Sequence, residues 1–419
     1  MPMSKTKIEE LREKRAAIAD QARKLIAKDA QTADDESKFD KMMDEVDKLK
    51  DQIDREERLV AVEASLSERI ELRAAKDGTS PDEAHDAMKA EDAVFGIYLR
   101  QGVGGLSAEQ RSIMMRRQQS LPTEIRAAQS AGTAGSGGYT VPTGMASKIE
   151  DAQKEFGAML QSGVAEMMVT ENGQSIPFPT SNDTSNVGEQ LGENTATAEQ
   201  DVAFGSVPID AYMFSSKLVR VSFQLLEDSA FNLENYLAGK LGERIGRIVN
   251  QRLTTGTGSG QPNGIVTASV QGKVGANGQT TSIIYNDLVD LEHSVDPSYR
   301  RGAKWMFHDS SLKVIKKLLD SQNRPLWMPG IAVGAPDTIL GYQYIINQDM
   351  ATMAANAKSV LFGAISKYLV RRVHGIGLLR LQERYAEQLQ VGFIAYQRFD
   401  GDLLDAGTNP VKHYANSAT

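Results

Sequence analysis

The sequence predicts an α+β protein in which a charged α-helical arm precedes a mixed body. Charged residues make up 50 of the first 126 residues, but only 52 of the 293 that follow. Apolar residues recur at every seventh position in the first part, which is typical of a coiled coil. In the second part, helical stretches alternate with β-prone stretches, which indicates an α/β or α+β fold.

The composition excludes several classes of protein. With 419 residues, 41% of them hydrophobic, the chain is expected to form more than one structural unit. A net charge of −8 argues against a dedicated nucleic-acid surface, because neutralising phosphates takes clustered Lys and Arg. The absence of cysteine excludes disulfides and thiolate metal sites. No apolar run approaches the roughly 18 residues of a membrane span and no signal peptide is recognisable, so no membrane contact is expected.

The arm, residues 1–126, carries its apolar residues in a narrow stripe. Two series have a spacing of seven: Leu11, Ile18 and Leu25, then Phe39, Val46, Ile53 and Val60. Because so thin a stripe cannot form an independent core, we expect the arm to associate with other molecules. The alternative is a solvated helical hairpin that folds onto its own chain. Further helices are predicted over residues 81–102 and 107–117, the second with Ser107 as its N-cap.

The stretch RAAQSAGTAGSGGYTVP, Arg126 to Pro142, joins the arm to the body. Gly, Ala and Ser dominate it, so it can neither hold a helix nor bury apolar area, and we expect it to be exposed and flexible. Such a strip suits a passive linker, and it also suits a protease that binds its substrate in extended form. The residues alone favour the linker.

The body begins with a short helix near Glu155 and continues as an acidic β excursion. No Lys or Arg occurs between residues 155 and 216, whereas nine Asp or Glu do. β-Prone stretches around residues 167–169 and 212–221 flank a segment rich in Ser, Thr, Asn and Gly. The pattern predicts a two-stranded projection with an acidic, polar tip. Because an isolated two-stranded sheet is marginally stable, this projection must lean on its own domain or on a neighbouring molecule.

A long helix is predicted from Asn232, as N-cap, to a C-terminal glycine at Gly256. Its buried ladder consists of Leu233, Leu237, Leu241, Ile245, Ile248, Val249 and Leu253. The following TGTGSGQPNGIV lacks the Lys-Ser/Thr of a phosphate-binding loop and follows a helix instead of opening one, so a tight turn is expected.

The rest of the body alternates helices and strands. Helices are predicted over residues 285–295 and 310–320, the latter capped by Asp309 or Ser310. Strands are predicted over residues 304–309, 338–347, 358–363, 367–373, 378–384 and 389–401.

No catalytic, cofactor or metal site is predicted. The five histidines, His85, His293, His308, His374 and His413, lack the spacing that pairs metal ligands on a helix. The sequence HDSS, His308–Ser311, contains triad residue types but is interpreted as a strand end followed by a helix cap. The pairs Arg371–Arg372 and Glu383–Arg384 are interpreted as solvated or interface charge, with buried interface ion pairs as the less favoured reading.

Several stretches of the body occur in a recognisable order. TGTGSGQPNGI follows the long helix, and ILGYQYIINQDM, SVLFGAISKYLVRR and LRLQERYAEQLQVGFIAYQRFDGDLLDAGTNPVKH close the chain. With the arm, the junction ending GGYTVP and the acidic excursion, they resemble the major capsid proteins of tailed bacteriophages with the Hong Kong 97-type fold. The resemblance covers essentially the whole chain.

The resemblance implies a domain for each part. Residues 1–126 would be a delta domain that guides procapsid assembly, 127–145 the junction and N-arm, and 146–419 the capsid body. Within the body, the E-loop would cover about 167–216, the spine helix of the P-domain about 232–256, and the A-domain about 280–380, with the P-domain as the remainder.

The resemblance also implies a function without enzymatic activity or cofactor. Copies of the chain would form pentamers and hexamers of an icosahedral shell around double-stranded DNA, in the host cytoplasm during assembly and then in the virion. Its partners would be itself, a portal protein, a maturation protease and, in some relatives, a decoration protein. We place the cut between Arg126 and Ala127. Some relatives crosslink an E-loop Lys to an Asn of another subunit, but no Lys lies between Lys154 and Lys217, so no isopeptide crosslink is expected.

Three alternatives stay open at this point. An encapsulin-like compartment is disfavoured by the long arm, whereas a gene transfer agent shell cannot be separated from a phage shell by sequence. From another class, a coiled-coil adaptor with a ligand-binding α/β body would form a small discrete oligomer instead of a shell.

Overall fold

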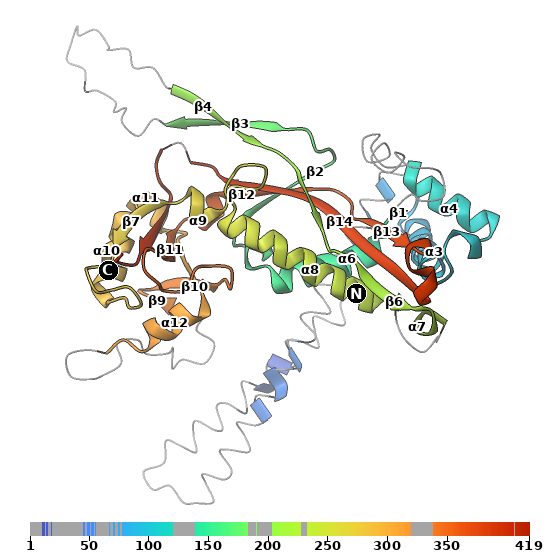
Figure 1. The fold of residues 1–419 in the computed structure, drawn as a ribbon, viewed down its shortest axis with the longest axis horizontal. Helices are drawn as coiled ribbons and strands as arrows, with labels where there is room; N and C mark the ends of the chain where they lie inside the picture. Colours follow the sequence, from blue (N-terminus) through green and yellow to red (C-terminus); the bar gives the residue numbers. More distant parts are fainter. Residues whose placement is uncertain are drawn as a thin grey trace, which may run out of the picture. The chain divides into compact units, whose positions relative to one another are not determined.

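A computed structural model of the chain divides into two compact units, residues 1–90 and 91–419 (Figure 1). The structure describes residues 78–119, 139–182, 203–227, 233–319, 338–405 and 407–419 without a break, together with residue 190 and scattered positions between residues 11 and 75.

The described positions of the first unit are mostly helical. Val46 and Ile53, seven residues apart, are both buried, and Ile18 is half-buried, in agreement with the predicted stripe. Leu25, Phe39 and Val60 lie outside the described residues. The coiled coil itself therefore stays a prediction.

Two predicted helices are confirmed near the start of the second unit. Helix α3 is Pro81–Gln101 and spans the division between the units, and α4 is Ala108–Gln119. Ser107 caps α4 as predicted: its Oγ accepts from the Gln110 N–H at 3.2 Å, while the Gln110 Oε1 accepts from the Ser107 N–H at 2.9 Å. A short 3-10 turn, η1 (Val103–Gly105), connects the helices.

A seven-stranded sheet forms the framework of the second unit. Its strands are β1 (Tyr139–Thr140), β2 (Glu166–Thr170), β5 (Tyr212–Ser215), β6 (Val219–Ser222), β12 (Tyr368–Val373), β13 (Gly377–Leu381) and β14 (Gln390–Leu403). The long strand β14 pairs antiparallel with β12 and β13 along one edge and with β5 and β6 along the other. β1 lies beside β13, and β2 runs parallel to β12.

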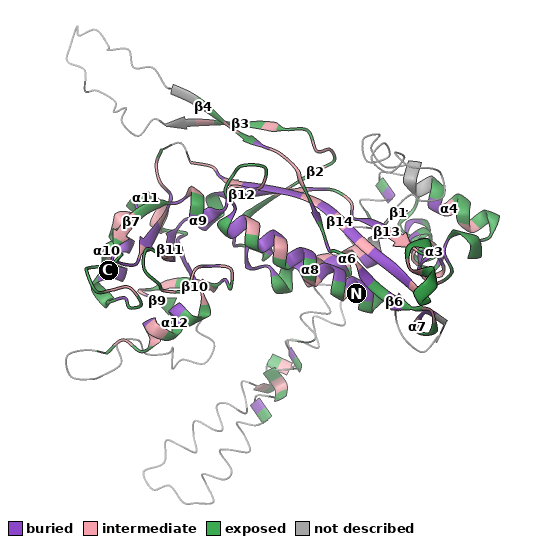
Figure 2. Cartoon of the chain, in the orientation of Figure 1, coloured by how far each residue is buried: buried purple, intermediate pink, exposed green. Residues whose placement is uncertain are grey.

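Two helices pack on this sheet. α8 (Leu233–Thr255) is the long helix that the sequence predicts, and its buried stripe includes Leu237, Leu241 and Ile245 (Figure 2). Ile248 is only half-buried, and the expected cap Asn232 lies outside the described residues. α6 (Thr143–Phe156) packs along α8 and begins well before the short helix predicted near Glu155.

A six-stranded sheet forms a second layer with its own core. Its order is β7 (Val270–Val274), β15 (Val411–Ala415), β11 (Lys358–Gly363), β8 (Lys304–Phe307), β10 (Tyr342–Ile346) and β9 (Thr338–Ile339). α10 (Tyr285–Ser294) and α12 (Asp309–Lys316) contribute Leu288, Leu291, Leu312 and Ile315 to a core around Trp305. The remaining short elements are η2 (Ala158–Leu160), α7 (Phe223–Glu227), α9 (Ile265–Ala268), α11 (Pro297–Arg300), η3 (Ile365–Lys367) and η4 (Glu383–Gln388).

The six-stranded sheet does not follow the limits expected for the A-domain, about 280–380. Its strands β7 and β15 lie outside those limits, whereas β12 lies within them and belongs to the seven-stranded sheet. Sheet membership thus cuts across the predicted boundaries, and the division into named capsid domains stays a prediction.

Two local expectations have different outcomes. The segment after α8 is a turn, as predicted, closed by an isolated bridge between Thr257 and Asn263. The expected cap of α12 is wrong: neither Asp309 nor Ser310 is the N-cap, because the His308 Nδ1 accepts from the Ser310 N–H at 3.0 Å. The imidazole replaces the usual side-chain oxygen, and Asp309 becomes the first residue of the helix.

A buried polar network joins α8 to the second layer. The Asn250 Nδ2 donates to the Asn347 Oδ1 at 2.8 Å, and the Asn347 Nδ2 donates to the Thr254 Oγ1 at 2.8 Å. The Asn250 Oδ1 accepts from the Met159 N–H at 2.9 Å. Because all three side chains are buried and partnered, the network fixes the second layer in one position on the helix.

The contact between α6 and α8 depends on a glycine. A Cβ added at Gly242 would lie 2.6 Å from the Ile149 carbonyl oxygen, whereas a Cβ added at Gly239 meets nothing within 4 Å. We expect Gly242→Ala to lower the free energy of unfolding by about 1–3 kcal/mol through overpacking. The matched control Gly239→Ala should raise it by up to about 1 kcal/mol through helix propensity. Urea denaturation of both variants measures this, and equal effects would contradict the close approach.

Candidate functional site

The most distinctive feature of the second unit is a two-stranded ribbon that projects beyond the seven-stranded sheet (Figure 1). It consists of β3 (Ile176–Asn182) and β4 (Ala203–Ile209), paired antiparallel from Ile176 opposite Ile209 to Asn182 opposite Ala203. The predicted two-stranded projection is therefore present, although the paired part is shorter than residues 167–216. Neither strand contains a charged residue. The predicted acidic tip lies almost entirely outside the described residues.

Prolines occupy the outer edges of the ribbon. Pro177 lies opposite Pro208, and Pro179 lies opposite Ser206. Since proline has no N–H, the Pro177–Pro208 pair must be one of the pairs that do not exchange hydrogen bonds, and their backbone groups face outward. The outer edge of β3 therefore lacks donors at Pro177 and Pro179, and that of β4 lacks one at Pro208, so each edge offers fewer donors to an added strand.

Arg371 anchors the base of the ribbon. It lies on β12 and is completely buried. Its Nη1 donates to the carbonyl oxygens of Gln174 at 2.6 Å, Ile209 at 2.9 Å and Asp210 at 3.1 Å. One guanidinium group therefore binds the chain that enters the ribbon and the chain that leaves it.

Two further hydrogen bonds complete the contact of Arg371 with the incoming chain. The Arg371 Nη2 donates to the Asn172 carbonyl oxygen at 2.9 Å, and its Nε donates to the Thr170 Oγ1 at 3.0 Å. Lysine cannot reproduce this arrangement, because its ammonium lacks the planar fork of donors. The interpretation of Arg371 as solvated or interface charge is thus wrong, since its partners are backbone carbonyls inside one subunit.

Of the other three residues in that interpretation, the exposed Glu383 and Arg384 fit it, whereas Arg372 is paired inside the subunit. Arg372 is half-buried and forms an ion pair with Glu150 of α6 at 3.0 Å. Glu383 and Arg384 are both exposed. Alternation of side chains along β12 sends Arg371 toward the ribbon and Arg372 toward α6.

Asp400 completes the base of the ribbon. It lies opposite Arg371 in the pairing of β12 with β14. Its carboxylate accepts from the Asp210 N–H at 2.5 Å and from the Gly401 N–H at 2.8 Å. Burial raises the pKa of Asp400 to about 6, and the nearby carboxylates of Asp210 and Asp402 add to the shift.

The described residues contain no constellation suited to catalysis or metal binding. No group of three or more His, Asp and Glu side chains that could hold a metal occurs among them. Ser269 and His413 are in contact at 2.9 Å, but both are buried, and the Ser269 Oγ donates to the Val266 carbonyl oxygen. Because both side chains are buried, this pair is interpreted as a structural contact between the end of α9 and β15.

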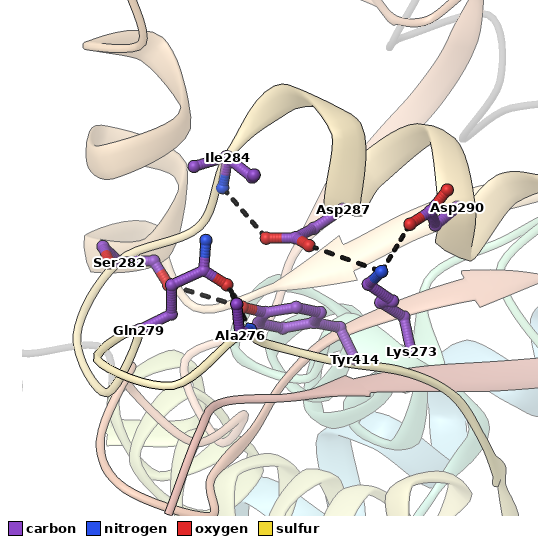
Figure 3. Close-up of polar contacts among 8 residues, drawn as sticks. All are labelled: Lys273, Ala276, Gln279, Ser282, Ile284, Asp287, Asp290 and Tyr414. Atoms are coloured by element: carbon purple, nitrogen blue, oxygen red, sulfur yellow. Dashed lines mark hydrogen bonds and ion pairs between the residues drawn. The ribbon is translucent and has the colours of Figure 1, made fainter. Parts of the chain in front are cut away.

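A second polar cluster lies on the six-stranded sheet (Figure 3). Lys273 of β7 binds Asp290 and lies 3.9 Å from Asp287, both on α10. The Asp287 Oδ2 accepts from the Ile284 N–H at 3.2 Å, and burial raises the pKa of Tyr414. These contacts fasten α10 to the sheet, which is a structural role.

The predicted site residues of the chain are not tested by this geometry. Arg126 and Ala127 lie outside the described residues. The sequence reasoning missed Arg371 and Asp400 as anchors of the ribbon, since each stands in a strand that reads as ordinary β sequence. Two adjacent arginines at the end of an otherwise apolar strand, YLVRRV, were the signal available for Arg371.

We expect Arg371→Lys to loosen the ribbon. It removes several hydrogen bonds and leaves buried carbonyl groups without donors, at a cost of about 2–4 kcal/mol. Hydrogen–deuterium exchange should rise in residues 172–182 and 203–210 and stay unchanged in α8. The control Arg372→Lys keeps a single ion pair and should exchange like the wild type. Unchanged exchange in the ribbon of Arg371→Lys would refute the anchor.

Asp400 should make stability depend on pH. Its folded pKa of about 6 lies above the roughly 3.9 of an unfolded aspartate, so its contribution is complete below pH 4 and is lost as the pH rises through 6. Relative to Asp400→Asn, the wild type should lose up to about 3 kcal/mol of unfolding free energy between pH 4 and 7. Urea titrations at each pH measure the difference. The control Asp151→Asn changes an exposed carboxylate, so its unfolding free energy should vary with pH as that of the wild type does. If the unfolding free energy of Asp400→Asn also varied with pH as in the wild type, the burial argument would be contradicted.

Comparison with known proteins gives the chain its family. The capsid of a native GTA particle has a TM-score of 0.54 and 23% identity, covering 64% of this chain and 90% of its own. A structure from Mycobacterium phage Bobi has a TM-score of 0.48 and 14% identity, covering 63% and 91%. No curated protein matches the chain. The first likeness confirms the predicted α+β capsid fold. A model of the phage capsid family matches residues 137–414, well over half of the chain, and the chain therefore belongs to the phage capsid family.

Proposed function

We propose that the chain is a major capsid protein that assembles into pentamers and hexamers of an icosahedral head enclosing double-stranded DNA. Membership of the phage capsid family makes it a structural protein of a capsid shell. The ribbon β3–β4 is the observation that supports the finer proposal. It is rigidly anchored by Arg371 and has no charged residue in its strands, which suits a contact that covers a neighbouring copy.

The arm would act before the shell matures. The family match begins at residue 137, so residues 1–126 precede the part that the family shares. We propose that this arm guides procapsid assembly and that a maturation protease cuts between Arg126 and Ala127. A portal protein and a decoration protein would be further partners in the virion.

No enzymatic role is proposed for the chain. The described residues offer no metal cluster, and no helix among them is long and apolar enough to cross a membrane. DNA would be held without sequence specificity, since a chain with a net charge of −8 is not a dedicated phosphate-binding surface. The subunit would have a purely structural role in building the shell.

A second candidate function is the shell of a gene transfer agent. The likeness to the capsid of a GTA particle favours it. Both candidates require the same self-assembly, and they differ in the origin of the packaged DNA. Sequencing DNA extracted from native particles separates them.

The expressed protein should form closed shells visible by negative-stain electron microscopy. On the ribbon, Phe178 and Val207 form a half-buried apolar pair on one face, while Ser206 lies on the other face. We expect Phe178→Asp to abolish shells because it buries an unpaired charge in the subunit contact. Ser206→Asp carries the same charge in the same ribbon and should still give shells. Discrete small oligomers of the wild type would refute the proposed function.

Mature particles should show the proposed processing. N-terminal sequencing should begin at Ala127, and a start at Met1 or within the body would reject the cut. On a denaturing gel the subunit should run as a single monomer band, because no lysine lies between Lys154 and Lys217. Ladders of covalently joined subunits would contradict the expected absence of isopeptide bonds.

A further inference from the structure

Residues 91–119, which we call the docked segment, belong to the core of the body although the proposed cut lies after them. They comprise the second half of α3 and all of α4. Their buried side chains in the main core are Val94, Phe95, Tyr98, Leu99, Leu106 and Met114. Leu99 is completely buried, and Met114, the most exposed of the six, is 9% exposed. The boundary between the two compact units of the chain falls after residue 90, and not near residue 126.

Polar contacts from β13 hold the end of α3. The Arg380 Nε donates to the Leu99 carbonyl oxygen at 3.1 Å, and its Nη2 donates to the Arg100 carbonyl oxygen at 3.1 Å. These carbonyls belong to the last turn of α3, which has no helical donors of its own for them. Arg380 is thus a cap supplied by the body to a helix of the arm.

Close packing at the body helices adds to this contact. A Cβ added at Gly96 would collide with the Glu234 carboxylate at the start of α8, and one added at Gly144 of α6 would collide with the Asp92 carboxylate. Burial raises the pKa of Glu234, with Lys148 and Arg100 acting in the opposite direction. α3 therefore touches both helices of the body.

The segment that follows the junction also binds β13. β1, Tyr139–Thr140, pairs antiparallel with Leu378 and Gly377 of β13. α4 in turn contacts β1. The two flanks of the proposed cut are consequently fixed to the body independently of the covalent link between them (Figure 1).

We propose that the docked segment stays bound to the body after the chain is cut, so that proteolysis at the junction does not by itself release the arm. The binding surface is the end of β13 with β1 and the first turns of α6 and α8, and its ligand is residues 91–119 of the same chain. Release requires this contact to open, which exposes the core side chains that the docked segment covers. The relevance of this contact to maturation rests on the proposed cut, but the contact itself does not.

The test uses a cut that is independent of any maturation protease. A recognition sequence for a site-specific protease is inserted between Arg126 and Gly137 of the full chain, and particle-free subunits are cleaved and passed over a size-exclusion column. Both fragments should elute together and separate only in denaturant. Separation of the wild-type fragments on the column without denaturant would overturn the proposal.

Two variants and a matched control identify the contact. Leu99→Ala should weaken retention of the arm fragment at least tenfold, and Arg380→Ala should weaken it without changing the core. Met115→Ala lies next to the buried Met114 but is 56% exposed, and it should retain the fragment like the wild type. Equal retention in all three variants would show that other contacts hold the arm and would also overturn the proposal. Either result leaves the shell-forming function untouched, because that is read separately by microscopy.

Discussion

The direction of the ribbon depends on a buried guanidinium at its base. Arg371 reaches from the seven-stranded sheet to carbonyl oxygens on both legs of the ribbon. A two-stranded ribbon is marginally stable alone, so its direction has to be fixed where it leaves the sheet. Asp400 binds the outgoing leg from the neighbouring strand, at the cost of a buried carboxylate. Because Arg371 binds the legs through their backbone carbonyl oxygens, these hydrogen bonds do not depend on which side chains the legs carry.

The position of the ribbon also depends on how the two layers are joined. α8 carries the seven-stranded sheet on its buried stripe and binds the second layer through Asn250 and Asn347. Apolar packing alone would tolerate sliding of one layer on the other, whereas a fully paired amide network has one satisfied arrangement. The subunit is therefore a rigid support, with its least supported part in the ribbon.

Much of this architecture follows from local patterns in the sequence. The period of α8 and the apolar strands of the body predict their elements closely, because burial on one side determines both. The sequence could not show that Arg371 is buried, since its partners are backbone carbonyls of residues some 160–200 positions away. α6 was missed because its burial comes from the close approach of α8 at Gly242, a tertiary effect. The docking of residues 91–119 was missed for another reason: the boundary at residue 126 follows the charge content of residues 1–126 as a whole, whereas this segment carries only seven charged residues in 29, and its apolar residues belong to the core of the body.

The prolines of the ribbon have a consequence for the subunit in solution. An exposed hairpin whose strands carry no charge is ordinarily a template on which further strands stack. Pro177, Pro179 and Pro208 interrupt the row of donors on the two outer edges, which disfavours the extension of one ribbon by another into a continuous sheet. In concentrated subunits, contacts through the faces of the ribbon, where side chains decide the fit, are thereby favoured over fibrillar growth along its edges.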